Sequence, residues 1–314
     1  GDNSPNKTID GVILNHKSNK SVFYKIFGDE NKITNLIGDK INKGFFEIIH
    51  TTDVVMSTDS PLEGAKRGKN TSMWLAIESV KNKEADIVVS AGNTGALLVI
   101  SKLNLKMIEN IDKPALSALW PNKKSMSVVL DLGANIECSS KNLLDFSIMG
   151  ASLYTSLYPG VKPNVGLLNI GSEELKGNEI IKETYQILNE KKSDNYDFAG
   201  YIEVNHLMDG EVNVIVSDGF TGNVALKTAE GTANFITSEL KKAMTGSLIG
   251  KISSLLNISN LKRFKKRLDP RLYNGAIFIG LDSPVVKSHG GTDYIGFSNS
   301  LDVCHRIVKG NLIE

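Results

Sequence analysis

Five short loops of this 314-residue chain combine glycine with side chains that can hold an anion or move a proton. They are Ser90–Gly95, Asp131–Asn135, Asn169–Asn178, Asp218–Asn223 and Lys287–Gly291. A helix that starts in such a loop presents free backbone N–H groups and the positive end of its dipole, which favour a bound anion. One loop of this build is weak evidence. Five of them indicate a site for a small anion.

Two kinds of residue in these loops are candidates for the chemistry. The substrate-binding candidates are Asn93, Thr94, Gly95, Asp131, Asn135, Asn169, Gly171, Asn178, Thr221, Gly222, Asn223 and Lys287. Lys176 lies in a glycine-bounded loop and is the predicted catalytic cation that pairs with phosphate. Asp218, which can also cap the following helix, and His289 are the predicted groups that orient a nucleophile or transfer a proton.

Structural roles are alternatives that the sequence leaves open for several of these residues. Asn93 and Thr94 can cap the helix that they precede. Asp131 and Asn135 can form an Asx-turn instead of touching a ligand. Lys176 can be an ordinary solvated lysine, because most lysines are exposed.

The elements that must position these loops alternate along the chain. Short apolar runs predict strands at 87–89, 128–130, 165–170, 212–217, 276–281 and 285–287. Amphipathic stretches predict helices at 96–105, 143–153, 178–188 and 223–244, with a closing helix to about 309. Strands that alternate with helices predict an α/β fold with a mostly parallel, doubly wound sheet flanked by helices. In such a sheet we expect the strand-to-helix loops to gather at one edge.

Several classes of protein are disfavoured. No GxGxxG, GxxxxGK[ST], GxSxG or HExxH pattern follows the predicted strands, so we expect no nucleotide cofactor and no metal. The formal net charge of +1 gives no reason to expect a nucleic-acid partner. Cys138 and Cys304 lie far apart and outside any metal-binding pattern, which favours two reduced thiols in a cytoplasmic protein. The apolar runs are too short for a membrane span.

A basic segment at 241–271 is the second feature of the chain. It carries nine lysines and arginines against one acid, Asp269. Apolar residues recur in it at helical spacing, and 257–260 divides it into two runs. We therefore predict a basic amphipathic helical insertion that contacts an anionic membrane surface or an acidic protein. The residues predicted to make this contact are Leu248, Ile252, Lys262, Arg263, Phe264, Lys265 and Lys266. An ordinary surface helix pair packed on the core or on a dimer mate is the alternative.

Five strings in these segments resemble the PlsX-type phosphate acyltransferases of bacterial phospholipid synthesis. They are Ser-Ala-Gly-Asn-Thr-Gly-Ala from Ser90, Leu-Asp-Leu-Gly-Ala-Asn from Leu130, Gly-Leu-Leu-Asn-Ile-Gly from Gly166 with Lys-Gly-Asn from Lys176, Ser-Asp-Gly-Phe-Thr-Gly-Asn-Val-Ala-Leu-Lys from Ser217, and Val-Lys-Ser-His-Gly from Val286. The match runs in order along the whole chain, which fits one α/β domain over residues 1–314. The opening Gly-Asp-Asn-Ser-Pro also resembles the start of that family without a preceding short strand, with Ser4 where the family usually has alanine.

The resemblance implies transfer of an acyl group from acyl carrier protein to inorganic phosphate, which gives acyl phosphate. It also implies a fold like isopropylmalate dehydrogenase and phosphotransacetylase, a homodimer, and peripheral attachment of a cytoplasmic enzyme to the membrane. A glycerol-phosphate acyltransferase is the expected downstream partner. The alternatives are a phosphotransacetylase-like enzyme that uses acyl-CoA, and a catalytically inactive membrane scaffold for lipid enzymes.

Overall fold

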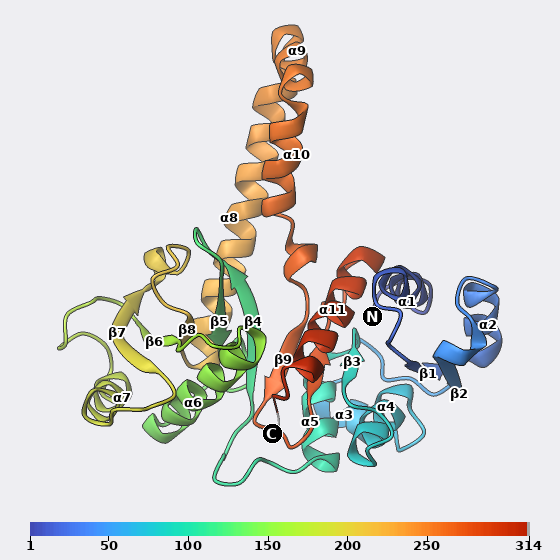
Figure 1. The fold of residues 1–314 in the computed structure, drawn as a ribbon, viewed down its shortest axis with the longest axis horizontal. Helices are drawn as coiled ribbons and strands as arrows, with labels where there is room; N and C mark the ends of the chain where they lie inside the picture. Colours follow the sequence, from blue (N-terminus) through green and yellow to red (C-terminus); the bar gives the residue numbers. More distant parts are fainter. Residues whose placement is uncertain (313–314) are drawn as a thin grey trace.

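An eight-stranded sheet runs through the molecule and is flanked by helices, as the α/β prediction requires (Figure 1). The structure is a computed structural model that describes residues 1–312. In spatial order the strands are β3 (Val88–Ser90), β10 (Val285–Lys287), β9 (Ala276–Ile279), β4 (Ala115–Pro121), β5 (Met126–Leu130), β8 (Val214–Val216), β6 (Asn164–Asn169) and β7 (Asp197–Glu203). A separate parallel pair is formed by β1 (Tyr24–Gly28) and β2 (Phe46–His50).

Helices follow most strands, and those predicted from the sequence are present within a few residues of their expected ends. They are α5 (Thr94–Asn104), α6 (Ser140–Leu157), α7 (Glu179–Glu190), α8 (Gly219–Thr245) and α11 (Tyr294–Lys309). The first 82 residues, where the sequence patterns predict no element, contain α1 (Asn6–Ser18), α2 (Glu30–Ile37), α3 (Pro61–Lys66) and α4 (Ser72–Lys81). Short 3-10 turns lie at Lys43–Phe45, Val204–His206 (η2) and Pro270–Tyr273 (η3).

The sheet is mostly parallel, but its centre is not, and this corrects one expectation. Four strand pairs of the large sheet are parallel, whereas β4 and β9 run antiparallel to each of their neighbours. The carboxyl ends of β3 and β10 therefore lie at the opposite edge from those of β5, β8 and β6. The prediction that all five loops gather at one edge is wrong, because three antiparallel pairings, β10–β9, β9–β4 and β4–β5, separate the two halves of the sheet.

The two halves are joined by continuous packing. The largest core cluster runs from β5, β6 and β8 to α6 and includes Leu130, Phe146 and Leu167, each with an exposed fraction of 0%. Ile277 and Val286, from β9 and β10, belong to the same cluster. Buried β-branched and leucine side chains on the central strands thus hold both groups of loops on one framework.

A helical projection stands out from this body (Figure 1). It is built from the second half of α8, which has 27 residues and spans about 40 Å, together with α9 (Leu248–Leu256) and α10 (Ile258–Arg267). α9 and α10 lie within the segment 241–271 and meet at Asn257. That this segment is an insertion in the domain stays a prediction. Within the described residues no helix is both long and apolar enough to cross a membrane.

Candidate functional site

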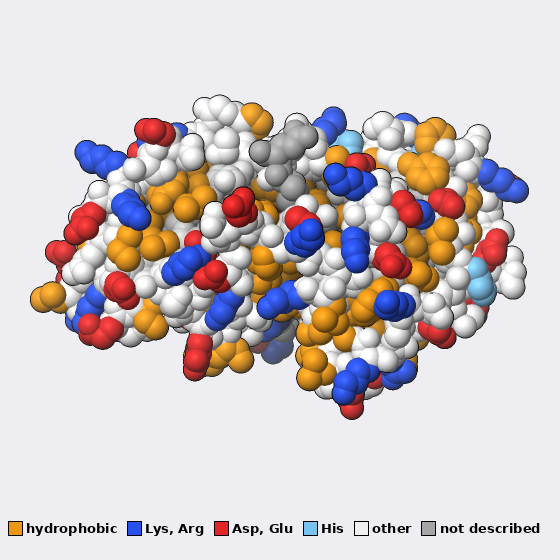
Figure 2. All heavy atoms as spheres, turned by 90° about the horizontal axis from the view of Figure 1, so that it is seen from below, with side chains coloured by type: hydrophobic (Ala, Val, Ile, Leu, Met, Phe, Trp, Pro, Cys, Tyr) orange, Lys and Arg blue, Asp and Glu red, His pale blue; other side chains and the backbone are white. Residues whose placement is uncertain are grey.

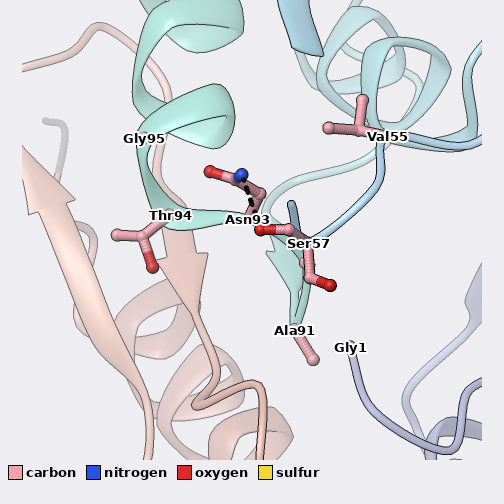
Figure 3. A pocket seen from close by; sticks show the side chains of 8 residues that line it. Gly1, Val55, Ser57, Ala91, Asn93, Thr94 and Gly95 are labelled. Atoms are coloured by element: carbon pink, nitrogen blue, oxygen red, sulfur yellow. Dashed lines mark hydrogen bonds between the residues drawn. The ribbon is translucent and has the colours of Figure 1, made fainter. Parts of the chain in front are cut away.

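A pocket of about 380 Å³ lies at the N-terminus of α5. Its lining comes from segments that are distant in sequence, namely Gly1, Val55 with Ser57, and residues 91–95 (Figure 3). The first N–H groups of a helix have no partner within the helix, so this end of α5 is suited to an anion. The size of the pocket is that of a small-ligand site.

Asn93 shapes the pocket from within. Its Oδ1 accepts a hydrogen bond from Ala96 N at 3.0 Å and caps α5, and its Nδ2 donates to Asp59 O at 2.7 Å. Both ends of the amide are therefore engaged, which favours the helix-capping alternative for Asn93. Thr94 is exposed and lies on the other side of the loop from Ser57, so its hydroxyl remains available to a ligand (Figure 3).

Two buried lysines stand next to this pocket, beside Gly1. Lys7 from α1 and Lys287 from the end of β10 are each only 7% exposed. Lys7 Nζ donates to Gly290 O, and Lys287 Nζ donates to Ser288 O. Within the described residues neither lysine forms an ion pair.

Both ammonium groups are held in an unfavourable setting. Burial, and to a lesser extent the positive charge of Lys7, lowers the pKa of Lys287 to about 8. Burial also lowers the pKa of Lys7, while Asp2 opposes this effect. Two buried, mutually repelling cations that form no ion pair among the described residues cost stability, and an arriving anion relieves that cost.

His289 follows Lys287 in the same loop and is exposed. Its backbone N–H donates to Asn274 Oδ1 at 2.9 Å, and its ring Nδ1 accepts from Gly291 N at 3.1 Å. A ring nitrogen that accepts carries no proton, so this contact assigns the neutral tautomer, with Nε2–H as the donor. Burial, then Lys287 and Lys227, lower the pKa of His289 and favour the same neutral form. His289 is thus placed to donate a hydrogen bond rather than to carry a charge.

Two charged residues of α8 act electrostatically on His289. Lys227 and Glu230 both affect the pKa of His289, and they form an ion pair with each other at 2.8 Å. Asn223 is exposed and lies one turn earlier on the same face of the helix. α8 therefore connects the Asp218–Asn223 loop at one edge of the sheet with the lysine pair at the other.

Asp131 is placed very differently from the lysines. Its side chain is completely buried, and Oδ1 accepts from the N–H groups of Leu116, Gly133 and Ala134. Oδ2 accepts from the backbone N–H and the side-chain Nδ2 of Asn135 at 2.7 and 2.8 Å. Asn135 Nδ2 also donates to the carbonyl oxygen of Pro114. These contacts favour the structural alternative for both residues, which hold the shape of the loop.

The carboxylate of Asp218 also accepts hydrogen bonds from within its own loop. It caps α8 by accepting from Thr221 N at 2.8 Å and from Thr221 Oγ1 at 2.7 Å. A side chain at Gly222 would come within 2.0 Å of Asp131 O, so only glycine lets the helix start this close to the neighbouring loop. Of the predicted site residues in this loop, Asn223 is the one with an exposed side chain.

Lys176 is carried by a loop whose other predicted site residues hold the backbone. Asn169 Nδ2 donates to Lys176 O at 3.0 Å, and Asn178 caps α7 by accepting from Ile181 N at 2.9 Å. The Lys176 side chain is exposed and, within the described residues, forms no ion pair. It lies in the group at the far edge of the sheet, with Asn223 and apart from Lys287.

Two residues of the site belong to no sequence pattern that predicts a functional role. Lys7 lies in α1, and Ser57 lies in an irregular segment that forms no predicted unit. Lys7 is 280 residues from Lys287, and no spacing rule connects them. A thiol nucleophile has no support, because burial raises the pKa of Cys138 to about 11 and the other cysteine is buried as well.

Comparisons with known proteins identify the family of this chain. The family model described as "Fatty acid synthesis protein" matches residues 1–314. A phosphate acyltransferase of Pelagibacter ubique is 77% identical over 314 residues, covering all of this chain and 94% of that protein. A phosphate acyltransferase of Rhodospirillum rubrum is 44% identical and covers all of this chain and 90% of that protein.

Solved structures support the fold. The EutD phosphotransacetylase of Staphylococcus aureus has a TM-score of 0.63 at 15% identity, covering 98% of this chain and 92% of that one. A phosphotransacetylase of Streptococcus pyogenes has a TM-score of 0.60 at 14% identity, with coverages of 97% and 91%. The phosphotransacetylase-like α/β fold implied by the resemblance is thereby confirmed. The chain belongs to the family of fatty acid synthesis proteins and, with its curated relatives, to the PlsX-type phosphate acyltransferases, so it is an acyltransferase.

Proposed function

We propose that this acyltransferase moves a fatty acyl group from acyl carrier protein to inorganic phosphate and so supplies acyl phosphate for phospholipid synthesis. The observation that carries the proposal is the pair of buried lysines, Lys7 and Lys287, beside the pocket at the N-terminus of α5. A dianion fits two cations better than any neutral nucleophile does. Phosphate also matches the N–H groups of the helix start.

The reaction then needs few proton transfers. An oxygen of the phosphate dianion attacks the thioester carbonyl carbon, and the carbonyl oxygen becomes an oxyanion. Collapse of this intermediate breaks the carbon–sulfur bond and releases the carrier's thiolate. Lys287 and Lys7 hold the phosphate, and His289 Nε2–H donates to phosphate or to the oxyanion. A thiolate leaves without strong acid help, which agrees with a neutral His289.

Lys176 and Asn223 are proposed to act on the thioester substrate. Both side chains are exposed, and Asn223 shares a face of α8 with Lys227, which is near His289. An amide N–H and an ammonium group are the donors that a developing oxyanion requires. The roles assigned to them from the sequence stay predictions.

A direct assay tests the proposed donor. The purified enzyme should form acyl phosphate from long-chain acyl carrier protein and phosphate much faster than it forms acetyl phosphate from acetyl-CoA. A preference for acetyl-CoA would instead favour the phosphotransacetylase-like alternative. Absence of turnover with both donors would favour the inactive scaffold.

The helical projection is proposed to contact the anionic membrane surface or the acidic carrier protein. At its tip Leu248, Ile249 and Leu256 are 79%, 80% and 82% exposed. The basic residues 262–267 follow on α10. The body opposite the projection instead carries acidic and basic side chains intermixed (Figure 2). Apolar tip and local positive charge together are typical of an interfacial helix.

Replacing Leu248 by glutamate should weaken binding to anionic vesicles by about tenfold or more, because a buried leucine contributes roughly 1.5–3 kcal/mol. Cosedimentation with vesicles at low and high salt measures this, and salt should weaken the wild-type interaction. Leu103→Glu is the matched control, since Leu103 is 63% exposed on α5, away from the projection. Equal binding by the Leu248 variant and the wild type would contradict a membrane role and favour dimer packing.

A homodimer is proposed from a further exposed apolar face on α8. Phe220 and Phe235 on this helix are 64% and 66% exposed, and Val224 between them is 50% exposed. A stripe of this kind is typical of a subunit contact. Sedimentation equilibrium of the purified enzyme checks the subunit number.

A glycerol-phosphate acyltransferase, which consumes acyl phosphate, remains the proposed downstream partner.

A further inference from the structure

The segment that joins the projection to the sheet also holds the loop that carries His289. This segment is residues 268–275, which follow α10, include η3, and enter β9. The loop is residues 288–293, which connect Lys287 at the end of β10 to the start of α11. Hydrogen bonds from the segment reach both ends of this loop.

Asp293, at the far end of the loop, is held by an arginine. Arg271 Nη1 donates to Asp293 Oδ2 at 2.7 Å, while its Nε and Nη2 donate to Asp269. Asp293 in turn caps α11 by accepting from Ile295 N. Asn299 of α11 donates to the carbonyl oxygen of Arg271 at 2.9 Å. The segment is thereby fixed against the first turns of α11.

Asn274 makes three hydrogen bonds, two with the near end of the loop and one with α11. Its Oδ1 accepts from His289 N at 2.9 Å. Its Nδ2 donates to Ser288 Oγ and to Gly296 O, both at 2.8 Å. The side chain is only 9% exposed, and Ser288 is completely buried, so no water replaces these contacts readily.

Asparagine is required here for a chemical reason. The position needs one acceptor and two donor hydrogens at the end of a short side chain, and the asparagine amide supplies all of them. Aspartate keeps the acceptor oxygen but lacks both donor hydrogens, and alanine lacks the acceptor and the donors. Asn274 therefore determines where the backbone of His289 lies, two residues after Lys287.

We propose that Asn274 is a positioning residue for phosphate binding, which sets the Lys287–His289 segment against the pocket at the start of α5. The inference rests on the proposed function, because it takes phosphate as the anion that this segment binds. Asn274 itself touches no substrate. It acts through the backbone of His289 and through Ser288, the residue between the two functional side chains.

The test compares Asn274→Ala and Asn274→Asp with Asn15→Ala. Asn15 is a matched control because it is 2% exposed and its side chain also makes three hydrogen bonds. Its Nδ2 donates to Ser298 O and Asp302 Oδ1 of α11, and its Oδ1 accepts from Tyr24 Oη of β1. It does not touch the 287–289 segment. Asn274→Ala and Asn15→Ala should both lower the melting temperature. Only the two Asn274 variants should raise the KM for phosphate, by about tenfold or more. Their KM for the acyl donor should change less.

A second readout does not depend on turnover. Inorganic phosphate should raise the melting temperature of the wild type and of Asn15→Ala, and should raise it much less for the Asn274 variants. If Asn274→Ala does not fold, Asn274→Asp decides. The inference would be overturned if the folded Asn274 variant had the same KM for phosphate as Asn15→Ala and were stabilised by phosphate to the same extent. A wild type that binds phosphate but transfers no acyl group would refute the proposed function alone.

Discussion

Lys287→Met should nearly abolish the use of phosphate and at the same time make the protein more stable. Methionine fills a similar volume, so packing is retained while the buried ammonium group is removed. Loss of a preorganised charged group in an active site typically lowers kcat by about 10²–10³. We expect a decrease of this order in kcat/KM for phosphate.

The gain in stability has a separate cause. Lys287 is 7% exposed and, within residues 1–312, has no ion pair, and its pKa is lowered to about 8 by burial and by Lys7. At neutral pH the folded protein therefore carries an unfavourable buried charge. Removing it should raise the free energy of unfolding by roughly 1–3 kcal/mol. Denaturant titration measures this, and lower stability of the variant would contradict the assignment.

The same pKa predicts a pH dependence. The ammonium form of Lys287 is present below pH 8 and is lost as the pH rises through about 8. Phosphate binding should weaken in that range, so kcat/KM for phosphate should fall above pH 8 in the wild type. The residual activity of Lys287→Met should lack this fall. Lys141→Met is the control, because Lys141 is exposed and already paired with Asp145, and it should leave the pH profile unchanged.

Asp131→Asn should destabilise the fold by about 1–3 kcal/mol. The carboxylate accepts five hydrogen bonds from N–H donors of Leu116, Gly133, Ala134 and Asn135. An asparagine in its place turns an NH₂ group toward some of these donors, and buried N–H groups lose their acceptors. The expected measurement is a fall in the free energy of unfolding in urea.

Asp145→Asn provides the comparison for this substitution. Asp145 is 9% exposed, and it pairs with Lys141, whose side chain is half exposed. Removal of that carboxylate should cost less than about 1 kcal/mol. A similar loss of stability in both variants would contradict the special role of Asp131. Destabilisation by Asp131→Asn should also disturb catalysis, because the Asp131 backbone contacts α8 at Gly222.

Much of this protein could be predicted from local patterns. Apolar runs such as 285–287 and amphipathic stretches such as 223–244 depend on residues close in sequence, so they predict strands and helices nearly at their observed positions. The loop strings, for the same reason, were enough to indicate the family. Strand direction was not predictable, because β4 and β9 carry no local signal for the antiparallel pairing that places Lys176 and Lys287 at opposite edges.

The amino-acid sequence by itself determined the α/β fold class, the position of the glycine-rich loops, the basic projection and the family. Only the tertiary structure decided which polar residues of those loops are free. Asp131, Asp218 and Asn93 are occupied in holding the backbone, whereas Lys287 is joined by Lys7 in a buried cationic pair. The physical reason is that hydrogen-bond occupancy, burial and charge pairing depend on contacts between segments far apart in the chain.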